Sequence, residues 1–182
     1  MIKRVAFLLI VITSFPSRAD PSREDIAWKY PCDLYFFNTC SHLPVGTSAH
    51  YSVPSDFGVS ILWQGEDGRE ILRIYSGDHP NASRRPKIAS FSEGAQSVDV
   101  HATTGGDELY VDVYVRPSNG GTATHILGTI TADNSVQFRE FIGALRACVP
   151  RKDGFSCPTS PRLGGKILSA LDVFSRKKTR LG

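Results

Sequence analysis

The sequence lacks the short motifs that mark the common enzyme classes. It contains no Gly-x-Ser-x-Gly nucleophile motif, no His-Glu-x-x-His zinc motif and no phosphate-loop pattern. Its five histidines stand apart, and none shares a metal-ligand spacing with another. There is also no internal repeat and no low-complexity tract. These absences predict a protein with no catalytic residue, no bound metal and no cofactor, and they favour a non-enzymatic role.

The chain also has little net charge once its first residues are set aside. The formal charge of +3 comes from three basic residues before position 20, and the remainder holds 18 basic and 18 acidic side chains. Within that remainder, residues 20–150 carry a net charge of −6 and residues 151–182 carry +6. A basic tail can contact nucleic acid or an anionic membrane, but no aromatic residue interleaves with the basic residues of Arg176–Arg180 to stack on bases. We therefore expect a solvated tail and no nucleic-acid partner.

Residues 1–19, by contrast, have the features of a secretory signal peptide. A short positive start precedes the continuous apolar run Val5–Ile12, and Ser17 and Ala19 provide the small residues of a cleavage site. The mature chain would begin at Asp20 and hold 163 residues, the size of one domain. The apolar run is too short to span a bilayer core of about 30 Å, and an uncleaved anchor is the alternative. We expect an exported protein, periplasmic or extracellular, with no transmembrane span in the mature chain.

Four cysteines follow this segment, at Cys32, Cys40, Cys148 and Cys157. An even count in an exported chain predicts two disulfide bonds. The spacings are not those of zinc sites, and an oxidising compartment argues against thiolate ligands. Three pairings are possible. We favour the two local ones, Cys32 with Cys40 and Cys148 with Cys157, over a crossed pairing that would staple the N-terminal segment to the C-terminal one.

Alternation of apolar and polar residues predicts a succession of antiparallel strands. The predicted strands lie at residues 57–63, 71–75, 98–101, 109–116 and 122–131. The first two flank an Asp-Gly hairpin signal, and the third and fourth flank a turn at Thr104–Asp107. A short apolar run at Leu34–Phe37 fits a further buried strand, and the polar stretch Arg84–Lys87 is expected to be a loop.

A change of period after residue 131 predicts a helix. Its apolar stripe would comprise Phe138, Phe141, Ile142, Leu145 and Cys148. Asn134 and Gln137 fit a capping box at its start. Residues 166–176 predict a second, marginal helix inside the basic tail.

Together these patterns predict an α+β fold, an antiparallel β-meander of about five to seven strands with a C-terminal helix packed on one face. The domain organisation would be a signal peptide at residues 1–19, a disulfide-stapled α+β domain at 20–160 and a basic, marginally helical tail at 161–182.

The face of the sheet opposite the helix is the candidate binding surface. Leu109, Val111, Val113 and Val115 alternate with polar residues, so the two sets point to opposite faces. If the strands pair through the Gly105–Gly106 turn, the polar set shares one face. It consists of Asp99, His101, Tyr110, Asp112, Tyr114 and Arg116. Tyrosine and arginine are favoured at binding hot spots, although an ordinary solvated face with cross-strand pairs is the alternative.

The loop after the second predicted strand offers three weaker candidates. Asp78 and His79 lie where sites often occur, but Gly-Asp-His-Pro-Asn is equally a turn sequence. Asn81-Ala82-Ser83 fits an N-glycosylation acceptor, which matters only in a eukaryotic secretory pathway. Arg84-Arg85 fits either a dibasic processing site or a polar loop.

Two C-terminal stretches resemble the opening of exported bacterial proteins of the ClpP-like serine protease type. They read ITADNSVQFREFIGAL at Ile130–Leu145 and SPRLGGKILSALDVFSRKKTRLG at Ser160–Gly182. That family shows a strand, a helix, Ser-Pro-Gly-Gly and another helix, so the resemblance implies an exported hydrolase. Here Arg162 and Leu163 interrupt the Ser-Pro-Gly-Gly pattern and would spoil the turn that forms an oxyanion hole. The chain also stops before the segment with the family's serine and histidine, so no catalytic residue is carried over.

Three interpretations of function follow. The first is an exported, non-enzymatic domain that binds or inhibits a protein partner of unknown identity. The second, implied by the resemblance, is a truncated or degenerate exported ClpP-like hydrolase. The third is a structural component of the cell envelope, joined to its neighbours through open sheet edges.

Overall fold

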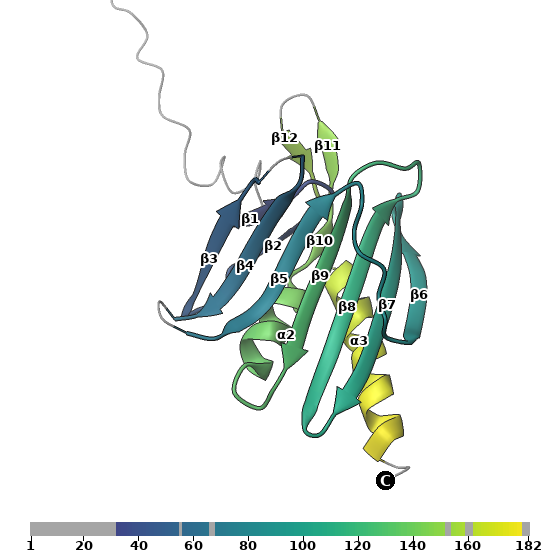
Figure 1. The fold of residues 1–182 in the computed structure, drawn as a ribbon. Coiled ribbons are helices and arrows are strands. Elements are labelled where there is room, and N and C mark those ends of the chain that lie inside the picture. The colour runs from purple at the N-terminus through teal and green to yellow at the C-terminus, as the bar shows by residue number, and fades with distance from the viewer. Residues whose placement is uncertain (1–31, 55, 66–67, 152–153, 159–161, 180–182) are drawn as a thin grey trace, which may run out of the picture.

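A computed structural model describes residues 32–54, 56–65, 68–151, 154–158 and 162–179 (Figure 1). The predicted signal peptide and its cleavage site lie outside the described residues. The elements are β1 (Leu34–Phe36), β2 (Thr39–Ser41), β3 (Thr47–Ser52), β4 (Gly58–Gln64), β5 (Glu70–Gly77), β6 (Lys87–Glu93), β7 (Gln96–Gly105), β8 (Glu108–Pro117), β9 (Ala123–Ile130), α2 (Ser135–Gly143), β10 (Arg146–Ala147), β11 (Val149–Arg151), β12 (Gly154–Ser156) and α3 (Arg162–Thr179).

Seven strands form one antiparallel sheet in the order β3-β4-β5-β9-β8-β7-β6. The chain forms β3, β4 and β5 in succession and then crosses to the far edge of the sheet, where β6 begins. Strands β7, β8 and β9 are then added one after another toward the centre, until β9 pairs with β5 (Figure 1). The predicted α+β class, mostly antiparallel with a C-terminal helix, is confirmed. The sheet is not one meander, however, because two meanders are joined side by side through β5 and β9.

The structure has more strands than the five to seven predicted: the short strands β2, β10, β11 and β12 and the two edge strands of the large sheet were missing from the sequence-based prediction. β3 (Thr47–Ser52) is polar and mostly exposed, and β6 begins at Lys87, inside the stretch expected to be a loop. An edge strand has one neighbour and little burial, so it needs no clear apolar alternation.

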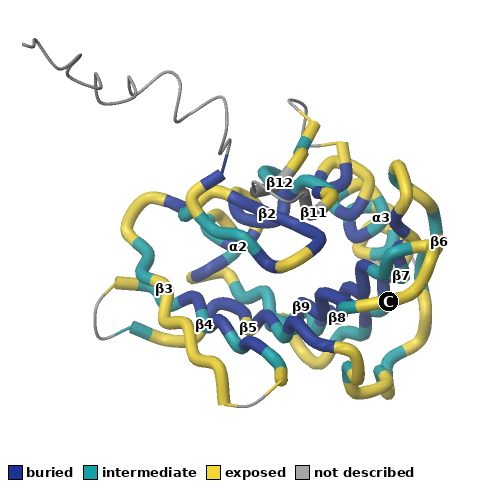
Figure 2. The backbone as a smooth tube through the Cα atoms, turned by 90° about the horizontal axis from the view of Figure 1, so that it is seen from above, coloured by how far each residue is buried: buried dark blue, intermediate teal, exposed yellow. Residues whose placement is uncertain are grey.

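Both helices and the small sheet β1-β2-β10 lie on one side of the large sheet, as the view in Figure 2 shows. α2 contacts β5, and α3 contacts β6 and β7. Alternate residues of the strands point into this layer and are buried. The core comprises Leu72, Ile74, Val98, Val100, Ala102, Val111, Val113, Val115 and Ile126 of the sheet with Phe138, Phe141, Ile142, Leu163, Ile167 and Leu171 of the helices. We call the opposite side of the sheet the outer face.

Three apolar residues of β4, Val59, Ile61 and Trp63, lie on this outer face. Val59 pairs with Tyr75, which pairs with His125, and directly paired residues share a face. The buried positions of β4 are instead Gly58, Ser60 and Leu62. The alternation correctly placed Val59, Ile61 and Trp63 together, but it carries no information about which face the helices cover.

α2 is shorter than its apolar stripe predicts. It ends at Gly143, and the stripe residues Leu145 and Cys148 are buried beyond it. The capping box is wrong in its contacts: Asn134 occupies the N-cap but makes no side-chain cap bond. Its side chain instead accepts a hydrogen bond from the Thr131 N–H at 2.9 Å and donates to the Thr129 carbonyl at 2.8 Å, fixing the turn that leads into the helix.

α3 has 18 residues and is part of the core, whereas the sequence predicted only a marginal helix over residues 166–176. Leu163, Ile167 and Leu171 are buried, which accounts for the helix through packing rather than local propensity. Within the described residues, no helix is both long and apolar enough to cross a membrane.

Candidate functional site

The six predicted binding residues share the outer face. β7 and β8 pair through the Gly105–Gly106 turn, so that Asp99 lies opposite Tyr114 and His101 opposite Asp112. Asp112 and Tyr114 nevertheless differ from the expectation of an open surface, because each is only 1% exposed.

The connection between β5 and β6 covers them. We call residues 78–86 the crossover loop, because this segment crosses the outer face on its way to the far edge. The Tyr114 hydroxyl donates to the Asn81 carbonyl at 2.6 Å, and the Ser83 hydroxyl donates to the Asp112 carboxylate. Arg85 Nη1 donates to the same carboxylate oxygen at 2.6 Å. Asp112 and Tyr114 therefore anchor the loop and are not themselves presented to solvent.

His125 completes the buried cluster and was not among the predicted site residues. Its Nε2 lies 3.4 Å from Asp112 Oδ1, too far for a well-formed hydrogen bond, and neither atom has a hydrogen-bond partner within the described chain. Burial alone would raise the pKa of Asp112. The contacts with His125, Ser83 and Arg85, with the charge of Arg85, outweigh burial and lower that pKa to about 2. Asp112 is thus an ionised carboxylate beneath the loop.

An aromatic stack lies beside this carboxylate. The rings of Tyr114 and His125 are 4.0 Å apart at 14°, and His101 meets the Tyr114 ring edge-on at 5.6 Å. The Arg116 guanidinium lies 4.5 Å from the centroid of the Tyr114 ring. His101 Nδ1 lies 2.9 Å from the Arg85 carbonyl, which ties the stack to the loop. The signal for His125 was the Asn119-Gly120 turn before the β-rich stretch 122–131, because a hairpin at that turn pairs β8 with β9 and sets His125 opposite Tyr114.

The charges of this region are layered. The carboxylate side chains are the more buried: the exposed fraction is 2% for Asp112 and 24% for Asp99. The cationic side chains of Lys87 and Arg116 are 49% and 41% exposed. Asp99 accepts from Lys87 at 2.9 Å and from Arg116 at 3.3 Å. Burial alone would raise the pKa of Asp99, but hydrogen bonds from Lys87 and Ser90 and the two cations lower it. Around Asp99 and Asp112 the outer face therefore presents cations to solvent, although residues 20–150 are acidic overall.

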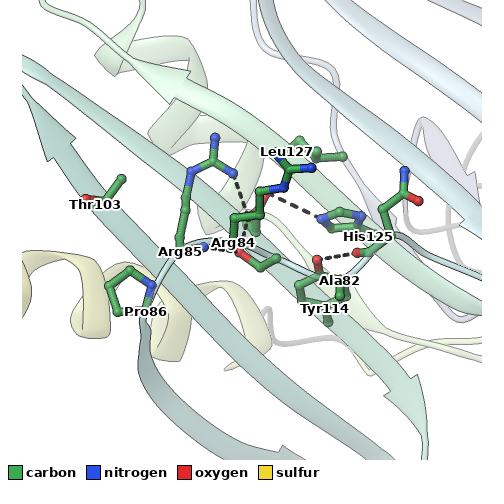
Figure 3. A pocket seen from close by; sticks show the side chains of 11 residues that line it. Ala82, Arg84, Arg85, Pro86, Thr103, Tyr114, His125 and Leu127 are labelled. Carbon is green, nitrogen blue, oxygen red and sulfur yellow. Dashed lines mark hydrogen bonds and ion pairs between the residues drawn. The ribbon is translucent and has the colours of Figure 1, made fainter.

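A cavity of about 450 Å³ opens between the crossover loop and strands β8 and β9. Figure 3 shows Arg84, Arg85, Tyr114 and His125 gathered around it. Arg84 is exposed, and no carboxylate in the described part of the chain lies within ion-pair distance of it. The cavity is thus lined by the exposed guanidinium of Arg84 and by the buried carboxylate of Asp112 and imidazole of His125.

Ser83, Asp112 and His125 do not form a serine–histidine–acid triad. In that triad the histidine base lies between the serine and the acid. Here the acid, Asp112, lies between Ser83 and His125, so the imidazole does not touch the hydroxyl.

The weaker candidates in the loop have structural contacts. Asp78 accepts from the Thr122 hydroxyl at 2.9 Å, and the backbone N–H of His79 donates to the Tyr75 hydroxyl at 3.4 Å. Asn81 is exposed, but the Ser83 hydroxyl of the same acceptor pattern is engaged by Asp112.

The cysteines form the favoured local pairs, Cys32–Cys40 and Cys148–Cys157, and the described residues include no free cysteine. The sulfurs of Cys40, Cys148 and Cys157 lie within 4.8 Å of one another. That spacing would suit a metal only if the sulfurs were thiolates, and in the disulfides they are not.

Comparison with family models, with curated proteins and with solved structures finds no match for this chain. Its function is therefore argued from the geometry of the outer face.

Proposed function

We propose that this chain is an exported, non-enzymatic binding domain that recognises an acidic segment of a protein partner with the crossover loop and the adjoining outer face. The observation that carries the proposal is the layering of charge, with the carboxylates beneath and the guanidinium and ammonium groups above. Such an arrangement offers donors outward, and Asp99 and Asp112 are each already paired with cations, so neither of these two carboxylates faces an acidic partner uncompensated.

The surface is also preorganised, which supports binding. Arg85 is held by Asp112, and Arg116 is held by Asp99 and the Tyr114 ring. Tyr110 is half-buried, with Arg85 5.7 Å from its ring centroid. Side chains fixed before binding lose less conformational entropy on association.

Export rests on the predicted signal peptide, and the two disulfides are compatible with an oxidising compartment. The alternative of a truncated or degenerate ClpP-like hydrolase has less support. The backbone N–H of Gly164, within the Arg162–Gly165 stretch that resembles that family, donates to the Leu145 carbonyl at 3.1 Å and is not free to hold an oxyanion.

Binding of polyglutamate tests the proposal directly, with polylysine as the opposite-charge control. The mature protein should bind polyglutamate with an affinity that falls as salt rises, and it should not bind polylysine. Arg84→Glu should weaken binding at least tenfold at unchanged melting temperature, because Arg84 is exposed and has no ion-pair partner among the described residues.

Arg176→Glu is the matched control, since Arg176 is also exposed but lies on α3, across the sheet from the loop. Equal loss of binding in both variants, or binding unaffected by Arg84→Glu, would rule out the loop as the recognition site. A partner recovered with the mature protein from its own culture should show the same ranking of variants.

A further inference from the structure

The two disulfides touch each other. Sγ of Cys40 lies 3.6 Å from Sγ of Cys157, although each sulfur is bonded to a different partner. The contact joins β2 of the small sheet to the residue after β12, positions 117 apart in the chain. Two cystines in contact differ chemically from two isolated ones, because a thiolate formed at one lies next to the other.

We propose that these cystines form a single thiol–disulfide exchange site, which accepts electrons from a small thiol and transfers the cross-link to the pair Cys40–Cys157. The inference does not depend on what the outer face binds, since the cystines lie with the helices on the opposite side of the sheet.

The entry point is Cys157. It is half-buried, whereas Cys40 and Cys148 are fully buried. With Cys148 it lines a cavity of about 300 Å³ that also includes Gln96, Val149 and Pro158. A small thiolate reaching this cavity meets Cys157 first.

Reduction of the first cystine takes two thiols. The incoming thiolate attacks Cys157 Sγ, forming a mixed disulfide while the bonding pair leaves on Cys148. A second thiol attacks the mixed disulfide, and the reagent departs as its own disulfide. Cys148 takes up a proton, and Cys157 is left as a thiolate beside Cys40.

Exchange follows within the protein. The Cys157 thiolate attacks Cys40 Sγ, the Cys40–Cys157 bond forms, the Cys32–Cys40 bond breaks, and the electron pair leaves on Cys32, which is protonated. In sum, two molecules of the small thiol are oxidised to one disulfide. The protein keeps one cross-link, Cys40–Cys157, and gains free thiols at Cys32 and Cys148.

The exchanged cross-link closes a much longer loop. The native pairs have sequence separations of 8 and 9, whereas Cys40 and Cys157 are 117 apart. A cross-link that closes a longer loop restricts the unfolded chain more. The exchanged protein therefore keeps a cross-link that opposes unfolding of the chain more than Cys32–Cys40 does.

Disulfide mapping of the wild-type mature protein tests this without any mutation. During titration with reduced glutathione, quenched with acid and mapped by mass spectrometry without reduction, the Cys40–Cys157 peptide should appear as Cys148–Cys157 is lost. Loss of the native pairs with no Cys40–Cys157 peptide at any point of the titration would overturn the proposal.

Two serine variants give a matched pair. Cys148→Ser leaves Cys157 free beside Cys40 and should convert, with no reductant, to Cys40–Cys157 with a free Cys32. Cys157→Ser leaves the buried Cys148 free and should keep Cys32–Cys40. Retention of Cys32–Cys40 in Cys148→Ser, or equal exchange in both variants, would count against a specific exchange site.

Discussion

Gly164 of α3 has no room for a side chain, because its α-carbon faces the carbonyl oxygen of Ile142 at the end of α2. A Cβ at this position would also lie 2.7 Å from the Gly143 carbonyl oxygen. We expect Gly164→Ala to lower the free energy of unfolding by about 1–3 kcal/mol, as overpacking does, because both partners are backbone atoms that cannot rotate away.

Gly165 supplies the control for this prediction. It is exposed in the same helix, and a Cβ added there would meet no atom of a neighbouring element within 4 Å among the described residues. Gly165→Ala should raise the free energy of unfolding by up to about 1 kcal/mol, since alanine favours a helix interior. Urea denaturation of both variants checks the opposite signs, and destabilisation by both would mean that the α2–α3 contact is misplaced.

The core face of α2 should be far more sensitive than its solvent face. Phe141 of α2 and Leu145, which follows the helix, are fully buried, so replacing either by alanine should cost about 2–5 kcal/mol. Glu140→Ala should cost little, and loss of the exposed Arg139–Asp172 pair should cost no more than about 1 kcal/mol. Similar effects at all of these positions in thermal melts would contradict the placement of the helix.

Tyr110 and Tyr114 should behave differently although they lie on one strand face. Tyr114 is buried, stacked on His125 and bonded to Asn81, so Tyr114→Ser should destabilise the fold by about 2–4 kcal/mol. Tyr110 is half-buried, and Tyr110→Ser should change stability by less than about 1 kcal/mol while weakening binding of polyglutamate. Calorimetry of the two variants separates a residue that holds the crossover loop from one that a partner can reach.

Stability should depend on pH through Asp112. Its pKa in the folded protein is about 2, below the ordinary value of 3.8, so the ionised carboxylate stabilises the fold above about pH 4. That contribution, on the order of 1–2 kcal/mol, is lost as the pH falls through 2. Asp112→Asn should therefore show a smaller loss of unfolding free energy between pH 4 and 2 than the parent.

Asp107→Asn is the control for the pH series, because Asp107 is exposed in the β7–β8 turn. It should follow the parent across the range. Parallel curves for Asp112→Asn and the parent would show that Asp112 is not the group that titrates.

Export with cleavage can be checked by mass. The protein recovered from the periplasmic or extracellular fraction should begin at or within a few residues of Asp20. An intact chain starting at Met1 in the cytosol would contradict the predicted signal peptide.

Local pattern predicted the parts of the fold that depend on one element at a time. Alternation placed Val111, Val113 and Val115 on one face and Asp112 and Tyr114 on the other, because side chains of a strand point to opposite sides whatever surrounds it. The turn residues around Gly105–Gly106 predicted the pairing of β7 with β8 for the same local reason. The cysteine spacing favoured the local disulfides, although it could not decide them.

Features that join distant segments required the tertiary structure. The pairing of β5 with β9 joins the two meanders, and no pattern in either strand specifies that neighbour. The same arrangement sends residues 78–86 across the outer face, which converts Asp112 and Tyr114 from expected surface residues into buried anchors.

The sequence by itself therefore determined which side chains share a face, where most strands of the large sheet and α2 lie, and that the cysteines pair. The tertiary structure alone decided which face is covered, how the two meanders join, and that two local disulfides meet through Cys40 and Cys157. The physical reason is the sequence distance over which each feature is set. Strand alternation and turn geometry are fixed within a few residues. Burial and contacts between elements depend on segments far apart in the sequence, which meet only when the whole sheet has formed.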